Sequence, residues 1–153
     1  MELNIRKAQQ NDFRAIIHLL ASNQLPTVDI YEKNITLFVG LLNNEIIATI
    51  GMENYGTVAL LRSLCVKEGF KNKKYGEKML SYLRTFCTQE KTEALYLLTT
   101  TAEHYFERYG FEKIVRNAAP LPIQTTREFQ SICPNSAVVM KLKCSPLLFI
   151  SQK

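Results

Sequence analysis

An abrupt change in the spacing of apolar residues, between positions 58 and 98, constrains the fold of this chain more than any other feature. Val58 to Val66 is a nearly continuous apolar run, which is typical of a strand at the centre of a sheet. Apolar residues then recur at helical spacing from Tyr75 to Cys87, and Ala94 to Leu98 is a second short apolar run. A strand, a helix and a strand in this order predict two parallel strands joined by a helix.

The segments on either side of this unit predict antiparallel pairing. Ile35 to Leu42 and Glu45 to Met52 are separated only by Asn43-Asn44, a two-residue hairpin signal. Further strands are expected at Leu3 to Arg6, Phe111 to Val115 and Ala137 to Leu142. We therefore predict an α/β (α+β) fold, with a mixed, mostly antiparallel central sheet of about six to seven strands, one parallel splayed pair and flanking helices.

Capping residues predict where the other helices begin and end. Asn11 precedes a helical pattern and is expected to be its cap, with Asp12 in the first turn. Thr27 to Lys33 fits either a loop or a short helix. Two capping boxes predict two more helices, which begin at Thr100 and Thr125 and end at Gly110 and Pro134.

The composition is that of a folded domain. Of 153 residues, 46% are hydrophobic and 22% are charged, which excludes a disordered chain, a collagen-like chain and a small disulfide scaffold. We expect a single domain over residues 1–153. Leu147 to Ile150 is too short to span a membrane, and charged residues near the N-terminus exclude a signal peptide. These features predict a cytoplasmic protein with no membrane partner and with reduced cysteines.

The net charge and the small number of potential metal-ligating residues limit the kinds of ligand that we expect the chain to bind. A net charge of +5 suits an anionic small molecule, but the basic residues are too scattered to indicate nucleic acid. The chain has only two histidines and no CxxC motif among its four cysteines, so we expect no metal site.

The segment after the Val58–Val66 run has the pattern of an anion site. Leu64, Cys65 and Val66 end the strand, and a turn from Lys67 leads to Tyr75 and Gly76, where the helix begins. A helix N-terminus presents N–H groups without acceptors and a partial positive charge, and three lysines surround this turn: Lys71, Lys73 and Lys74. The pattern predicts a pyrophosphate site; the alternative is a solvated, lysine-rich turn before an ordinary helix.

A second segment of the sequence, taken with the first, carries a resemblance to a known family. Ala94 to Leu98 is followed by a helical stretch that ends in Tyr109-Gly110-Phe111. The order of both segments resembles the GCN5-related N-acetyltransferase (GNAT) superfamily, over nearly the whole chain. The closest resemblance is to the branch associated with arsenic resistance, through the motifs Leu61-Arg62-Ser63-Leu64, Leu98-Thr99-Thr100-Thr101-Ala102-Glu103, Arg116 with Ala119-Pro120, and Cys133-Pro134 with Ser136-Ala137.

The resemblance implies that the chain binds acetyl-CoA as co-substrate. The main chain of Leu64 and Val66 would pair with the pantetheine arm, and the amides from Lys71 to Gly76 would hold the pyrophosphate. The implied cofactor-binding set is Leu64, Cys65, Val66, Lys71, Asn72, Lys73, Lys74, Tyr75, Gly76 and Thr99. Lys71 stands where the family has Gln or Arg, and Lys74 stands where it has glycine.

The position that many family members use for proton delivery is also altered. Phe106 stands four residues before Gly110, where those members have a tyrosine that protonates the leaving thiolate. A CoA thiol with a cysteine-like pKa of about 8.5 leaves without much help. Tyr105 is a candidate for the acid, with packing as the alternative.

Three charged residues are candidates for work on the acceptor. Glu53, at the end of a predicted strand, is a candidate base that takes a proton from the amine; the alternative is a solvated carboxylate. Arg62 lies inside an apolar strand, so it must meet a carboxylate, a ligand or water. Arg62 and Arg116 are candidates to bind an acidic group of the acceptor, and an internal ion pair is the alternative for Arg62.

The sequence thus predicts an acetyl-CoA-dependent N-acetyltransferase for a small, amino-acid-like amine, by direct attack in a ternary complex. The resemblance extends the acceptor to an arsenical or phosphinic amino acid and implies a possible homodimer. A non-catalytic acyl-CoA-binding module stays open as an alternative, because Lys74 and Phe106 depart from the family pattern.

Overall fold

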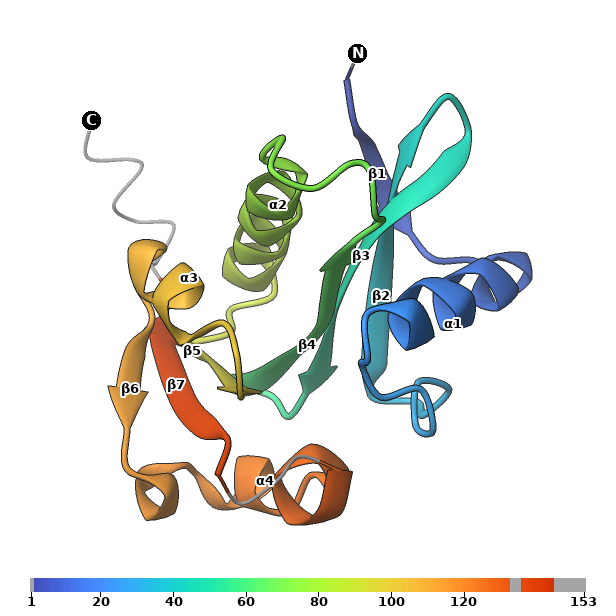
Figure 1. Ribbon diagram of the computed structural model, residues 1–153. Helices are drawn as coiled ribbons and strands as arrows, with labels where there is room; N and C mark the ends of the chain where they lie inside the picture. Colours follow the sequence, from blue (N-terminus) through green and yellow to red (C-terminus); the bar gives the residue numbers. More distant parts are fainter. Residues whose placement is uncertain (1, 133–135, 145–153) are drawn as a thin grey trace. The chain divides into compact units, whose positions relative to one another are not determined.

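Seven strands form a mixed sheet in the computed structural model, which describes residues 2–132 and 136–144. Their hydrogen-bonded order is β1-β2-β3-β4-β5-β7-β6 (Figure 1). Only the β4–β5 pair is parallel among the pairings described, and this confirms the predicted fold class. The strands are β1 (Asn4–Lys7), β2 (Ile35–Leu42), β3 (Glu45–Asn54), β4 (Val58–Val66), β5 (Ala94–Thr99), β6 (Glu112–Ile114) and β7 (Val138–Lys143).

The chain divides into two compact units. The first comprises Met1–Glu53 and Leu61–Phe86, and the second comprises Asn54–Leu60 and Cys87–Lys153. In the part of the chain that the structure describes, no helix is long and apolar enough to cross a bilayer. The helices are α1 (Phe13–Ser22), α2 (Tyr75–Gln89), α3 (Glu103–Arg108) and α4 (Leu121–Gln124), with 3-10 turns η1 (Gln10–Asp12) and η2 (Arg116–Ala118) and a π-helical segment η3 (Glu128–Ile132). The single domain over residues 1–153 stays a prediction.

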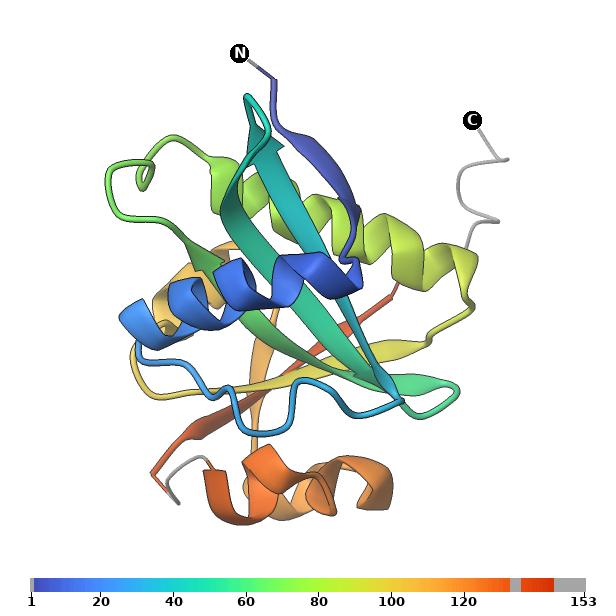
Figure 2. The same ribbon diagram turned by 90° about the vertical axis from the view of Figure 1, so that its right-hand side faces the viewer.

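In the first unit, α1 and the part of α2 that belongs to it cover opposite faces of the strands (Figure 2). Alternation along β2 explains this layering, because successive side chains of a strand point to opposite faces. Leu37 and Val39 belong to the same core cluster as the α1 residues Ile16 and Leu20. Between them in sequence, Phe38 makes edge contacts with the α2 rings of Tyr82 and Phe86, at centroid distances of 5.2 and 5.0 Å.

Gly40 lets α2 approach the sheet closely. A Cβ added at Gly40 would stand 2.8 Å from Sδ of Met79, which is closer than real contacts allow. Burial of Met79 and Leu80 from α2 therefore depends on the missing side chain of this glycine.

The β2–β3 hairpin turns at Asn43-Asn44, as predicted. Both asparagines have left-handed backbones, with φ of 49° and 66°. A two-residue hairpin loop favours this conformation because its twist matches that of the strands, and asparagine adopts it at low cost.

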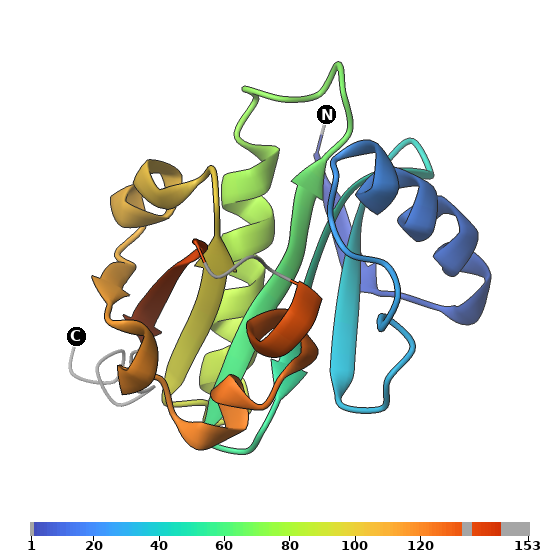
Figure 3. The same cartoon turned by 60° about the horizontal axis from the view of Figure 1, so that its bottom comes forward.

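The second unit is built on β5, β6 and β7 together with the first residues of β4 (Figure 3). Parallel pairing joins Val58–Leu60 of β4 to Ala94–Tyr96 of β5, and β7 pairs with β5 on one side and β6 on the other. Leu60, Tyr96 and Val139 share its core cluster with Ile123 of α4.

Two expectations at the N-terminal side of the chain, the positions of Asn11 and Asp12, need correction, and one open alternative is decided. Asn11 is not a helix cap, because it lies inside η1. Asp12 is the N-cap residue of α1, but its side chain does not bond to that helix. Its carboxylate accepts hydrogen bonds from the Gln9 N–H, at the start of η1, and from Arg6 Nη1, both at 2.7 Å. Residues 27–33 form turns rather than a short helix.

Neither predicted capping box forms, and in each case the neighbouring threonine bonds to the backbone instead. Before α3, the hydroxyl that bonds to the backbone belongs to Thr99 and not to Thr100: Thr99 Oγ1 accepts from the Ala102 N–H at 2.9 Å. Thr125 is the C-cap of α4, and the hydroxyl of Thr126 accepts from the Phe129 N–H at 3.2 Å. Gly110 ends α3 with φ of 100°, as its position predicted, whereas Pro134 lies outside the described residues.

Candidate functional site

The predicted site residues are distributed over both units. The first unit holds Glu53, Arg62, Leu64, Cys65, Val66, Lys71, Asn72, Lys73, Lys74, Tyr75 and Gly76. The second unit holds Thr99, Tyr105 and Arg116. Each group is described within its own unit.

The turn between β4 and α2 is exposed and has a left-handed backbone at several positions. Gly69, Asn72 and Lys74 have φ of 93°, 64° and 68°. Lys74 stands where the family pattern has glycine. Its backbone has the conformation that glycine adopts most readily. The lysine takes this conformation at the cost of local backbone strain.

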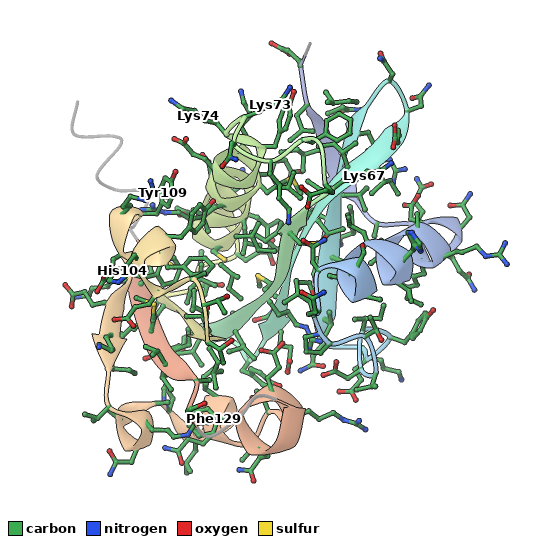
Figure 4. All side chains as sticks on the ribbon, in the orientation of Figure 1. Lys67, Lys73, Lys74, His104, Tyr109 and Phe129 are labelled. Carbon is green, nitrogen blue, oxygen red and sulfur yellow. The ribbon has the colours of Figure 1, made fainter. Side chains whose placement is uncertain are left out.

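The turn leads directly into the N-terminus of a 15-residue helix. Lys74 O accepts the first intrahelical hydrogen bond, from the Lys78 N–H at 3.1 Å. By helix geometry, the N–H groups of the first turn have no acceptor within the helix and carry partial positive charge. Lys73 and Lys74 lie at this end of α2, as Figure 4 shows, and both are exposed. These donors and charges fit a pyrophosphate group.

Lys71 is the third lysine of the turn and has a carboxylate beside it. Its ammonium lies 3.5 Å from Glu68 Oε1, and both side chains are largely exposed. An exposed ion pair of this kind is weak, so an anionic ligand can compete for the lysine.

Strand β4 has a left-handed residue at Ser63, with φ of 61°. This conformation interrupts the regular strand just before Leu64, in the manner of a bulge residue. The Ser63 carbonyl accepts a hydrogen bond from Thr49 Oγ1 at 2.7 Å, which fixes the interruption from the buried side. Leu64 and Val66 are half-buried, whereas Cys65 between them is buried.

Cys65 is a core residue. Its thiol lies 3.3 Å from Thr49 Oγ1 and packs in the same cluster as Leu19 and Leu41. Burial raises the pKa of Cys65 to about 11, so the thiol is neutral at physiological pH. Any contribution of Cys65 to ligand binding therefore comes from its main chain.

Arg62 is held by two carboxylates inside the first unit. Its Nη1 donates to Asp29 Oδ2 at 2.8 Å and to Glu53 Oε1 at 2.7 Å, and its Nη2 donates to Asp29 Oδ1 at 2.5 Å. The exposed fractions of the three side chains are 0% for Arg62, 1% for Asp29 and 4% for Glu53. Of the three partners expected for Arg62, a carboxylate, a ligand or water, the structure shows carboxylates, in an internal ion pair. Binding of the acceptor by Arg62 stays a prediction.

This arrangement corrects the alternative considered for Glu53. A solvated carboxylate at the end of a strand is wrong, because Glu53 is buried and bound to Arg62 near the end of β3. Two carboxylates share one guanidinium here, so the cluster carries one excess negative charge when both are ionised. Its role as a base stays a prediction.

Sequence reasoning missed Asp29 altogether. The residue lies in the connection from α1 to β2, between exposed Val28 and buried Ile30. An arginine inside an apolar strand was the signal that it meets a carboxylate, a ligand or water, but the sequence does not say which residue reaches it.

Tyr105 and Phe106 lie on α3 in the second unit. Phe106 is buried against Phe111, at a centroid distance of 5.4 Å, and has no hydroxyl to donate a proton. Tyr105 is half-buried, with the Arg108 guanidinium 5.5 Å from its ring centroid and Tyr109 at 5.0 Å. Tyr105 lines an open surface hollow together with His104, Glu107 and Arg108.

Arg116, on η2, is held by the aromatic ring and main chain of its own unit. Its guanidinium lies 4.6 Å from the ring centroid of Phe129, which Figure 4 labels, and its Nη1 donates to the Ala137 carbonyl at 3.3 Å. Its Nη2 is buried and has no hydrogen-bond partner among residues 2–132 and 136–144. A buried donor of this kind suits an anionic oxygen.

Thr99 uses its hydroxyl within the chain, in the turn that precedes α3. The hydroxyl accepts from the N–H groups of Thr101 and Ala102, so its hydrogen atom is left to donate elsewhere. Within the described residues, no group of three or more His, Cys, Asp or Glu side chains is placed to hold a metal ion.

Comparison with known proteins shows the family to which this fold belongs. The model of the acetyltransferase (GNAT) domain family matches residues 33–113, just over half of the chain. No curated protein matches the sequence.

Solved structures match over most of the chain. N-acetylglutamate synthase from Neisseria gonorrhoeae, complexed with coenzyme A and N-acetyl-glutamate, is similar with a TM-score of 0.82 and 16% identity. The match covers 95% of this chain and 36% of that one, so the chain spans about a third of this relative.

Two further structures match over nearly their whole length. An acetyltransferase of the GNAT family from Staphylococcus aureus Mu50 has a TM-score of 0.78 and 18% identity, with coverage of 94% and 100%. The ribosomal-protein-S18-alanine N-acetyltransferase from Escherichia coli has a TM-score of 0.75 and 17% identity, with coverage of 94% and 95%. The chain belongs to the acetyltransferase (GNAT) domain family.

Proposed function

We propose that the protein transfers the acetyl group of acetyl-CoA to the amine of a small, amino-acid-like acceptor. The observation that carries this proposal is the turn before α2. Its left-handed backbone at Lys74, the helix N-terminus that follows at once, and the three lysines around it fit the pyrophosphate of CoA. The complex of N-acetylglutamate synthase with coenzyme A supports the same ligand for this fold.

The main chain of β4 is proposed to hold the rest of the CoA arm. Leu64 and Val66 would pair with the pantetheine, and the Val66 N–H would donate to the thioester oxygen as negative charge develops on it. Asn72, Lys73, Tyr75 and Gly76 would surround the pyrophosphate through their amides. Thr99 is proposed as a further contact.

Direct attack requires a neutral amine. An alkylammonium group with a pKa near that of lysine is mostly protonated at neutral pH, so a base must accept its proton. Glu53 is proposed for this role, through a chain of water molecules because the carboxylate is buried. Arg62 would hold Glu53 in place through the 2.7 Å hydrogen bond.

The leaving thiolate needs little assistance. Phe106 cannot supply a proton, and the cysteine-like pKa of about 8.5 expected for CoA makes its thiolate a good leaving group. Tyr105 is the remaining candidate for the acid, from the second unit.

An anionic group on the acceptor is proposed to bind Arg116. Its buried Nη2 offers a donor, and a guanidinium suits the oxygens of a carboxylate, a phosphinate or an arsonate. The motif resemblance favours an arsenical or phosphinic amino acid as acceptor. A cytoplasmic homodimer completes the proposal and rests on the family resemblance and the composition.

A second candidate function is an acyl-CoA-binding module without turnover. Two observations favour it: Phe106 is buried and has no hydroxyl, and Glu53 is engaged by Arg62. This module would bind acetyl-CoA and release no thiol with any amine.

A screen of amines with detection of released CoA thiol separates the two candidates. Acetyl transfer to an amino acid with an anionic group is the expected result, and Glu53→Gln should lower kcat/KM by about 10²–10⁴. The loss should be largest at low pH, because the amine is already neutral at high pH. Glu45→Gln, on the same strand but exposed, is the matched control. Acetyl-CoA binding without thiol release for any amine would support the binding module.

A further inference from the structure

Two cysteine thiols meet at the C-terminal end of α2, within the second unit. Cys87 is the third residue from the end of the helix and is fully buried, and Cys144 directly follows β7 and is half-buried. Both are thiols in this structure. The two side chains form a thiol–thiol hydrogen bond. The proposed acetyl transfer uses neither of them.

The backbone bonds the two cysteines to two residues that are adjacent in sequence. The Thr92 N–H donates to the Cys87 carbonyl at 2.9 Å, and the Cys144 N–H donates to the Glu93 carbonyl at 2.8 Å. The next pair along the sheet, Ala94 with Lys143, continues the β5–β7 ladder. The contact between the thiols is therefore fixed by secondary structure on both sides.

The surroundings assign different roles to the two sulfur atoms. The hydrogen bond with Cys144, burial and the charge of Glu90 all raise the pKa of Cys87. Cys87 therefore keeps its proton and donates it to the sulfur of Cys144. Cys144 is also the more accessible of the two, so an oxidant in solution reaches it first.

We propose that Cys87 and Cys144 form an intramolecular disulfide when the protein meets a hydroperoxide. The Cys144 thiol first attacks the peroxide, which gives a sulfenic acid and one water molecule. The Cys87 sulfur then attacks the sulfenic sulfur, and its proton leaves with the hydroxyl group as a second water molecule. The two thiols lose two electrons in total, and one molecule of hydrogen peroxide accepts them.

The disulfide would join the end of α2 to the end of β7 across a long loop. A link of this kind restricts the unfolded chain, so oxidation should raise the melting temperature by about 5–10 °C. This inference is independent of the proposed acetyl transfer.

Peptide mapping of the full chain tests the proposal, because trypsin places each cysteine in a different peptide. Cleavage after Arg84, Lys91 and Lys143 releases residues 85–91 and 144–153, each with one of the two cysteines. The reduced protein is treated with one equivalent of hydrogen peroxide, blocked with an alkylating agent and digested. The expected product is a linked pair of these peptides that is two hydrogen atoms lighter than their sum.

Variants distinguish this pair from chance oxidation. Cys144→Ser and Cys87→Ala should abolish the linked pair and the rise in melting temperature, and Cys65→Ala should leave both unchanged. The same treatment in urea should give mixed pairings that include Cys65 and Cys133. Sulfinic acid at Cys144 without a linked pair in the folded protein, or equal yields of all pairings with and without urea, would overturn the proposal.

Discussion

Arg62 binds Asp29 through both of its terminal nitrogens, with Nη1 2.8 Å from Oδ2 and Nη2 2.5 Å from Oδ1. Asp29 lies in the connection between α1 and β2, whereas Arg62 lies in β4, so the pair ties this connection to a strand. Both side chains are buried, and the two parallel hydrogen bonds give the pair a fixed geometry. Glu53 shares the same guanidinium, so the position of one candidate catalytic residue depends on this contact.

Asp29→Asn should destabilise the protein strongly. The substitution replaces one of the two carboxylates that bind buried Arg62 and turns amide N–H groups toward its guanidinium, while Glu53 still compensates the charge. The lost charge-assisted hydrogen bonds should cost about 2–3 kcal/mol in the free energy of unfolding. Urea denaturation of the purified variant measures this loss. Glu32→Gln changes an exposed residue in the same connection and should stay within about 0.5 kcal/mol. Equal stability of the two variants would contradict the role assigned to Asp29.

Lys74→Gly should stabilise the turn before α2. Glycine relieves the left-handed backbone at φ of 68°, although it also makes the unfolded chain more flexible, so we expect a net gain of about 0.5–1 kcal/mol. Lys73→Gly, one residue earlier, has no such strain to relieve and should lose about the same amount. Thermal denaturation of the two variants side by side gives the comparison, and a loss at both positions would argue against strain at Lys74.

The lysines of the turn should contribute to CoA affinity through charge. The double variant Lys71→Gln, Lys73→Gln is expected to raise the Kd for acetyl-CoA by about 3–10-fold at low salt. The increase in Kd should be smaller at high salt, because salt screens the charges. The same loss is expected with dephospho-CoA, which keeps the pyrophosphate. Lys33→Gln, an exposed lysine elsewhere in the first unit, is the control. A loss of affinity for CoA without a loss for dephospho-CoA would place the lysines at the 3′-phosphate, which dephospho-CoA lacks.

The Arg6–Asp12 pair should make stability depend on acid. The hydrogen bond from Arg6 holds the pKa of Asp12 below its usual range, with further help from the Gln9 N–H. A carboxyl with a lowered pKa stabilises the folded state above the pKa of the unfolded chain, about 4, and loses this contribution as pH falls through the lower value. The stability difference between the natural protein and Asp12→Asn should therefore be largest near pH 6 and shrink below pH 4. A difference that stays constant from pH 6 to pH 2 would contradict the ion pair.

Periodicity was sufficient to predict most of the fold. The β4 run is nearly all apolar and matches its strand from Val58 to Val66, and the helix from Tyr75 follows its apolar stripe. Caps were less predictable, because Thr99 and Thr100, or Thr125 and Thr126, offer equivalent hydroxyls to nearby N–H groups. Only the path of the backbone decides which threonine accepts them.

The site shows the same division between local and distant information. The turn before α2 is contiguous in sequence, so its lysines and the altered glycine position were visible directly. Arg62 indicated a partner because an uncompensated charge in an apolar strand lowers the free energy of unfolding. The partner, Asp29, is far away in sequence, and the pairing depends on how the α1–β2 connection returns to the sheet.

Binding of acetyl-CoA, measured by titration calorimetry on the reduced full chain, tests the central claim most directly. Our account predicts one site per chain with a Kd of about 1–100 μM, a range typical of enzyme substrates. It also predicts competition by CoA, because the proposed contacts are with the pyrophosphate and the pantetheine. The absence of a heat of binding at millimolar acetyl-CoA, with the protein shown to be folded, would contradict the account.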